Sequence, residues 1–136
     1  ITLNQWFDDS LLKEDSSQNI YFPSVNKKNY DSFSKLFFKI DVEGHEESVI
    51  KGAQNTIKKT LPIILVEIEQ RHVNKNITEI YKKILDMNYD GFFLDKGKLT
   101  SINNFNYEAH QKPFLENTMS REYINNFIFI PNKHKK

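Results

Sequence analysis

Acidic and histidine residues gather in two short segments of the sequence, and these residues have the clearest chemical potential. The first cluster consists of Asp41, Glu43, His45 and Glu46. The second cluster consists of Glu67, Glu69 and His72. Carboxylates beside imidazoles can bind a divalent cation, act as a general base, or hold a hydroxylated ligand. Residue type alone leaves all three chemistries open.

Glu67 is the most informative single residue, because it stands inside the apolar run Ile63–Ile68. Burial of a carboxylate costs free energy, so a buried carboxylate is expected to have a charged or hydrogen-bonding partner or a functional role. The plain structural alternative is that the acidic residues only end strands and begin helices, with Gly44 supplying backbone freedom. The spacing of the first cluster is not a dedicated metal signature, so a divalent metal is not favoured and no metal ligand is assigned.

Two apolar runs, Leu36–Val42 and Ile63–Glu69, lead into these clusters and are typical of strands covered on both faces. A helix is predicted between the runs from the apolar stripe Val49, Ile50, Ala53, Ile57 and Leu61. A second helix is predicted after them from the stripe Ile77, Ile80, Tyr81, Ile84 and Leu85. Asn76, with Glu79 three residues later, forms a capping arrangement for that second helix.

Further strands are predicted to complete the sheet. Phe92–Leu94 and Leu99–Ile102 flank a turn at Asp95–Lys98, in which Gly97 is free to adopt positive φ, and Phe127–Ile130 forms the closing strand. This order of elements favours an α/β domain with parallel central strands and an antiparallel C-terminal addition. Ligands bind beyond the carboxyl ends of the strands in such sheets, and both clusters are expected there.

The composition excludes several classes of function. Lys and Arg total 19 against 18 for Asp and Glu, and this net charge of +1 offers no basic surface for nucleic acid. The absence of cysteine excludes disulfides, thiolate zinc sites and a cysteine nucleophile. The four glycines form neither a dinucleotide loop nor a phosphate loop. No Gly-x-Ser-x-Gly segment is present, so serine hydrolase chemistry is unsupported.

One domain is expected across residues 1–136, because a single hydrophobic core commonly serves about 100–150 residues. Residues 1–35 are expected to form a lead-in strand at Ile1–Phe7 and a surface loop, and residues 36–102 the core. Residues 103–136 are expected to form a loop, the final strand and a basic tail. The apolar stretches are far shorter than the roughly 20 residues of a membrane helix, so we expect a soluble, cytoplasmic domain without a transmembrane segment.

The segment Lys39–Ala53 resembles the FkbM family of S-adenosylmethionine-dependent methyltransferases, and the resemblance covers roughly Leu36–Ile102. It implies a Rossmann-like class I methyltransferase sheet, of which this chain carries the fourth to seventh strands with the intervening helices. The family's glycine-rich cofactor loop, and the acidic residue after its second strand, lie upstream of the matching segment. We therefore expect this chain, which begins at Ile1 and not at Met, to be the C-terminal portion of the domain without its N-terminal cofactor-loop half.

The resemblance also implies roles for the two clusters. Asp41 matches the family residue at the tip of the fourth strand, near the position of methyl transfer, and Asp41 and Glu43 are expected to bind the cofactor. The expected catalytic residues are Asp41, His45 and Glu67. Asp41 or His45 would take the proton from a hydroxyl, and Glu67 would orient that base or bind the hydroxyl. The expected substrate-binding residues are Glu46, Glu69 and His72.

The implied cofactor is S-adenosylmethionine, and the implied reaction is O-methylation of a hydroxyl on a sugar, a glycolipid or a small metabolite. Two alternatives stay open: a methyltransferase-like module that binds a ligand without catalysis, and an inactive fragment that lacks the cofactor loop. A chain without the first strand of the sheet would expose the edge of the fourth strand. Exposed edges tend to associate, so self-association into a homo-oligomer through that edge is a further expectation.

Overall fold

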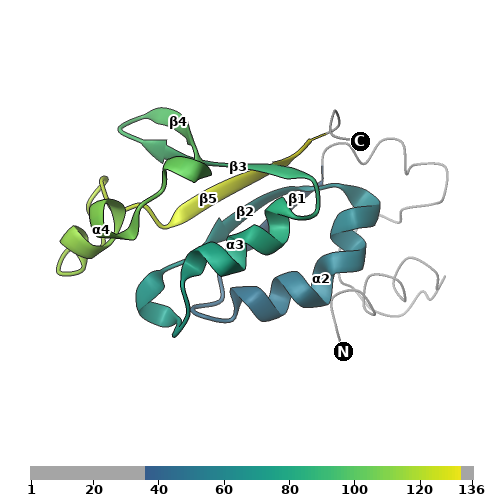
Figure 1. Cartoon of the computed structure of the whole chain (residues 1–136), viewed down its shortest axis with the longest axis horizontal. Coiled ribbons are helices and arrows are strands. Elements are labelled where there is room, and N and C mark those ends of the chain that lie inside the picture. Colours follow the sequence, from purple (N-terminus) through teal and green to yellow (C-terminus); the bar gives the residue numbers. More distant parts are fainter. Residues whose placement is uncertain (1–35, 133–136) are drawn as a thin grey trace, which may run out of the picture.

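Two helices pack on one face of a five-stranded sheet in the computed structural model, which describes residues 36–132 (Figure 1). The strand expected at Ile1–Phe7, the connection after it and the end of the basic tail lie outside the described residues. Within the described range, no helix combines the length and the apolar character that a bilayer crossing requires.

The sheet combines one parallel pair of strands with an antiparallel end. Its strands are β1 (Phe37–Ile40), β2 (Ile63–Glu67), β3 (Tyr89–Asp95), β4 (Lys98–Ser101) and β5 (Asn126–Pro131). Their spatial order is β1-β2-β5-β3-β4, with β1 and β2 parallel. β5 runs antiparallel to both β2 and β3, and β3 pairs with β4 as an antiparallel hairpin. The predicted α/β class, with a parallel pair followed by an antiparallel addition, is confirmed.

The helices begin and end where local chemistry favours it. Among residues 36–132, the α-helices are α2 (Glu46–Thr60), α3 (Ile77–Leu85) and α4 (Tyr107–His110), and the 3-10 helices are η2 (Gln70–His72), η3 (Ile102–Asn104) and η4 (Lys112–Phe114). The cap predicted at Asn76 is confirmed, because its Oδ1 accepts a hydrogen bond of 3.0 Å from the Thr78 N–H. The hairpin turn is also as predicted, with Lys96 and Gly97 both at positive φ.

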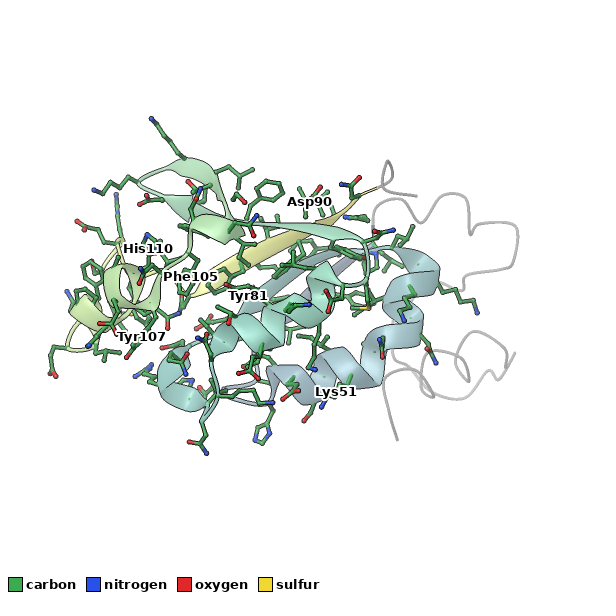
Figure 2. All side chains as sticks on the ribbon, viewed as in Figure 1. Lys51, Tyr81, Asp90, Phe105, Tyr107 and His110 are labelled. Carbon is green, nitrogen blue, oxygen red and sulfur yellow. The ribbon has the colours of Figure 1, made fainter. Side chains whose placement is uncertain are left out.

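The hydrophobic core lies between the sheet and the two helices, α2 and α3, that pack on one of its faces. Ile64 and Val66 of β2 are fully buried there, and the register pairs them with Phe129 and Phe127 of β5. The apolar side chains of α2 and α3 that pack on this face of the sheet are Ile50, Ala53, Ile57, Ile77, Ile80 and Ile84. Beyond β4, Phe105 and His110 stack with ring centroids 5.4 Å apart and extend the core toward α4 (Figure 2).

The prediction that both apolar runs are strands covered on both faces differs from the structure of residues 36–132 in two respects. First, only one face is covered by the described residues, because α2 and α3 lie on the same side (Figure 1). The side chain of Phe37 on the other face is 53% exposed, and that of Leu65 is half-buried. Second, β1 ends at Ile40, so Asp41 follows the strand instead of lying within the run.

Two smaller expectations about element ends are also corrected. Leu61, expected on the stripe of the first helix, instead ends α2 at φ 48° and is exposed. A left-handed residue at this position turns the chain out of the helix, and Pro62 follows it. Ile102, expected in the hairpin, lies in η3, because its side chain is buried in the core instead of continuing the strand.

We predict that Phe127→Ala lowers the free energy of unfolding by about 3–5 kcal/mol, because it empties a site packed against three aromatic rings. Ile130→Ala is the matched control on the same strand, since Ile130 points to the opposite face and is 38% exposed. The control should lose about 1 kcal/mol or less. Urea unfolding with unchanged m-values measures both, and equal losses would contradict the one-sided core.

Candidate functional site

The two acidic clusters meet at the carboxyl ends of β1 and β2. The parallel register pairs Ile40 with Val66, so Asp41 and Glu67 are the next residues on neighbouring strands. Farther out, Gly44 lies against the backbone of His72, where a Cβ on Gly44 would stand 2.6 Å from the His72 carbonyl oxygen. The loops after the two strands are therefore in direct contact, and the clusters share one edge of the sheet.

A tight turn connects β1 to α2 and presents the first cluster. Glu43 and Gly44 both have positive φ, and the His45 N–H donates to the Val42 carbonyl across the turn at 3.3 Å. Glu46 is only 2% exposed, and its Oε1 accepts the Gly44 N–H at 3.1 Å. Its Oε2 is buried without a hydrogen-bond partner among the described residues. In this structure Glu46 therefore holds the turn, and its carboxylate is buried.

The other members of the first cluster are open to solvent. Asp41 is exposed beside Lys39, whose Nζ lies 3.2 Å from the Asp41 Oδ2. Such an exposed pair contributes at most about 1 kcal/mol and holds neither partner firmly. Glu43 is exposed on the turn, and His45 occupies the residue before α2 without a capping bond from its side chain. Asp41, Glu43 and His45 are thus available to a ligand.

Glu67 stands at the end of β2 with a half-buried side chain on the sheet face away from the helices. Asn125 donates to its Oε1 at 3.0 Å and orients the carboxylate. Burial raises the pKa of Glu67, and the neighbouring negative charges of Asp41 and Glu69 raise it further. A positioned carboxylate whose pKa is shifted toward neutral pH is suited to accept a proton.

Glu69 has a structural environment that differs from that of Glu67. It is 7% exposed and binds Arg71, whose Nε lies 2.6 Å from Oε2, and the Tyr123 hydroxyl donates to the same oxygen at 2.5 Å. Burial alone would raise the pKa of Glu69, but the hydrogen bonds from Arg71 and Tyr123 bring it below its ordinary value. Glu69 is therefore an ionised anchor for the exposed Arg71 at the rim of the site.

A buried glutamine fixes the backbone around Glu69. The Gln111 side chain is fully buried and donates from Nε2 to the carbonyls of Ile68 and Ile124, each at 2.9 Å. Its Oε1 accepts the Gln70 N–H, also at 2.9 Å. These bonds fix the backbone on both sides of Glu69 and tie it to the residues before β5. The position of the second cluster thus depends on a segment more than forty residues away.

His72 completes the edge and is exposed in η2, with its N–H donating to the Glu69 carbonyl at 3.1 Å. Arg71, Gln111, Tyr123 and Asn125 were not singled out by the sequence analysis. Arg71 could have been found, because it follows Glu69 by two residues and carries the opposite charge. The other three come from a distant loop, for which the sequence offers no local signal. Among residues 36–132, no group of three His, Asp or Glu side chains is arranged to hold a metal ion.

We predict that Gly44→Ala destabilises the protein more than Gly97→Ala does. Both glycines have positive φ, so both variants bear a backbone cost of roughly 1–2 kcal/mol. Only Gly44 also meets a neighbour, the His72 carbonyl, whereas a Cβ on Gly97 meets nothing within 4 Å. The difference between their free energies of unfolding should be about 1–3 kcal/mol. Equal losses in urea unfolding would show that the two loops are not in contact.

We predict that Glu67→Gln makes the protein more stable at neutral pH. Because the folded-state pKa of Glu67 is raised, the folded state binds its proton more tightly than the unfolded state does. Stability therefore falls as pH rises from the ordinary value of 4.5 through the raised value, and the variant escapes that loss. Urea unfolding at pH 7 should favour the variant, and this advantage should shrink toward acidic pH. A variant less stable than the wild type at pH 7 would contradict the raised pKa.

The family model of the FkbM methyltransferase domain matches residues 15–90. The match covers more than half of the 136 residues and includes the turn between β1 and α2 and the end of β2. Gln111, Tyr123 and Asn125 lie beyond it. No curated protein and no solved structure shows significant similarity to the chain. The family resemblance inferred from the sequence is thereby confirmed, and this chain belongs to the FkbM methyltransferase family.

Proposed function

We propose that the chain serves S-adenosylmethionine-dependent methyl transfer to a hydroxyl group, with the carboxyl ends of β1 and β2 forming the acceptor side of the site. The observation that carries this proposal is the proximity of Asp41 to Glu67, which is close enough for the charge of Asp41 to raise the Glu67 pKa. Methyl transfer to an alcohol needs a group that accepts the hydroxyl proton and an alignment of the reacting atoms. The family membership supplies the reaction class, and this edge offers residues of the required type.

The described residues fit one side of the proposed cofactor. Asp41 and Glu43 are exposed carboxylates directly after β1, and carboxylates suit a ligand that carries a sulfonium, an amino group and ribose hydroxyls. The bound cofactor would supply a methyl group activated by the positive sulfonium. Asp41 and Glu43 would hold it through charge and hydrogen bonding at the tip of the strand. No divalent metal is needed for this arrangement.

Glu67 is our choice for the proton acceptor among the three catalytic candidates. It is half-buried, its pKa is raised, and Asn125 fixes its Oε1, whereas His45 is exposed without a capping bond. When the methyl group leaves the sulfonium for the hydroxyl oxygen, with the bonding pair staying on the sulfur as a neutral thioether, the hydroxyl proton would pass to the Glu67 carboxylate. Asp41 would then favour that protonation by its negative charge. His45 would contact the acceptor from the turn.

The acceptor is proposed to be a hydroxyl of a sugar, a glycolipid or a small metabolite. The rim offers Arg71 and His72 as exposed donors beside the buried carboxylate of Glu69. Hydroxyl groups can pair with such donors and with carboxylates, which is the pattern a carbohydrate requires. In substrate binding, Glu69 would act by anchoring Arg71, and Glu46 would act by supporting the turn between β1 and α2.

The placement of the chain within a Rossmann-like methyltransferase sheet is part of the same proposal. It is supported by the parallel pair β1 and β2, which α2 connects, and by β5, which lies between β2 and β3 in the opposite direction. β1 and β2 would be the fourth and fifth strands. Among residues 36–132, β1 pairs only with β2, so its outer edge is the proposed contact for a second copy of the chain.

The test is methyl transfer from isotopically labelled S-adenosylmethionine to a panel of sugars and hydroxylated metabolites. We predict that Glu67→Gln lowers the turnover number by about 10²–10⁴-fold, since it removes the proton acceptor and keeps the shape of the side chain. Glu108→Gln is the control, because Glu108 is exposed on α4 and, among residues 36–132, its carboxylate forms an ion pair only with Lys112.

Three outcomes separate the alternatives in this experiment. An unchanged rate in Glu67→Gln would remove Glu67 from the mechanism. A wild-type chain that binds the cofactor in calorimetry but methylates no acceptor would be a binding module. A chain that does not bind S-adenosylmethionine would not be an enzyme in isolation, which is the outcome expected of a fragment.

A further inference from the structure

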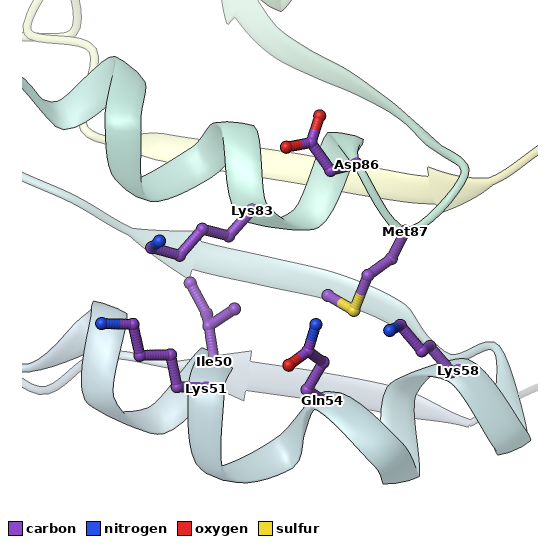
Figure 3. Close-up of a pocket in the computed structure, with 7 residues that line it drawn as sticks. All are labelled: Ile50, Lys51, Gln54, Lys58, Lys83, Asp86 and Met87. Atoms are coloured by element: carbon purple, nitrogen blue, oxygen red, sulfur yellow. The ribbon is translucent and has the colours of Figure 1, made fainter.

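A groove of about 280 Å³ runs between α2 and α3, on the helical layer and separate from the strand ends (Figure 3). It is lined by Ile50, Lys51, Gln54, Lys58, Lys83, Asp86 and Met87. Its floor is apolar, because Ile50 and Met87 are the buried members of the set. None of the residues assigned to methyl transfer contributes to it. The remaining members are polar, and three of them are lysines.

One end of the groove carries an excess of positive charge. The carboxylate of Glu47 lies within 3.3 Å of three ammonium groups, with Lys75 at 2.6 Å and Lys51 at 3.0 Å from its oxygens and Lys83 the farthest. Lys51 comes from α2 and Lys83 from α3, and both contact the same oxygen. Their ammonium groups are therefore held near each other across the groove. Glu79 also interacts with Lys75, so three ammonium groups face two carboxylates and a net positive charge remains at this end of the groove.

The other end of the groove adds a cation and no free anion. Lys58 lines it and makes no ion pair within the described part of the chain. Asp86 is the acidic residue in the lining, and both of its oxygens are bound by Lys82 at 2.9 and 3.0 Å. The Gln54 amide lies between Lys51 and Lys58 along α2, where it can donate a hydrogen bond (Figure 3).

We propose that the groove between α2 and α3 binds the phosphate group of a small phosphorylated molecule. A phosphate monoester carries a charge of about −1.5 to −2 and several strong acceptor oxygens, which match the excess charge and the donors of the groove. Lysine binds phosphate as a point charge and needs no fixed fork geometry. The apolar floor of Ile50 and Met87 can accept the carbon skeleton that bears the phosphate. This proposal does not depend on the proposed methyl transfer.

The proposal is tested by titrating the chain with glycerol 3-phosphate and following the backbone amide signals by NMR. The amides of the groove, including Gln54 and Met87, should shift and saturate, with a dissociation constant of about 1 mM for contacts partly screened by salt. Sodium chloride at matched ionic strength and glycerol are the two ligand controls. Neither should reproduce the saturating shifts.

Lysine variants identify the ammonium groups that bind the phosphate. Lys51→Gln combined with Lys83→Gln should weaken binding by about tenfold or more, and Lys58→Gln should weaken it measurably. Lys112→Gln is the matched control, because Lys112 is an exposed lysine on η4 that pairs with Glu108, and neither of these residues lines the groove. All these side chains are exposed or half-exposed on helices, so the melting temperature should change little.

Each remaining outcome overturns the proposal. Shifts that follow ionic strength equally in chloride and in glycerol 3-phosphate would show screening of surface charge and no site. Equal affinities of the wild type and the double variant would place the phosphate elsewhere. Binding to vesicles containing phosphatidic acid, without binding of glycerol 3-phosphate, would show a membrane surface as the ligand and not a small molecule.

Discussion

The packing of α2 and α3 against a single face of the sheet sets the position of every other element. Ile64, Val66, Phe127 and Phe129 are fully buried on that face, although the paired residues are more than sixty positions apart in the chain. Burial of such side chains stabilises a fold by about 1.5–3 kcal/mol each, which outweighs any local preference of the strands. The polar residues are consequently displaced to the ends of the strands, where the edge of the sheet meets solvent.

The candidate site depends on polar bonds where the apolar core stops. Gln111, Tyr123 and Asn125 enter from the segment before β5 and bind the backbone or the carboxylates that follow β2. The FkbM match ends at residue 90, so these three supports lie outside the part of the chain that the family model recognises. A buried amide such as that of Gln111 stabilises the fold only when all of its hydrogen bonds are made. It therefore favours a single arrangement of the backbone segments that it connects.

Local signals in the sequence were sufficient to predict the helices and strands. They were also sufficient to predict that the two acidic clusters lie at the same edge of the sheet. Asn76 as a helix cap and Gly97 in a hairpin turn depend on neighbours within a few residues, so their roles could be predicted. The one-sided burial of β1 and β2 could not, because an apolar run does not reveal how many helices will cover it. The partners of Glu69 and Glu67 in the loop before β5 were equally hidden, since hydrogen bonds across more than fifty residues leave no periodic pattern.

The net charge of +1 conceals a separation of charge within the fold. Carboxylates dominate the carboxyl ends of β1 and β2, and ammonium groups dominate the groove between α2 and α3. Among the described residues, negative charge is therefore concentrated at the strand ends and positive charge along the groove. Cationic and anionic ligands would be drawn toward these two regions respectively, but only within about 8 Å at physiological ionic strength. This attraction acts at the opening of each site and discriminates between ligands by the sign of their charge before they contact a side chain.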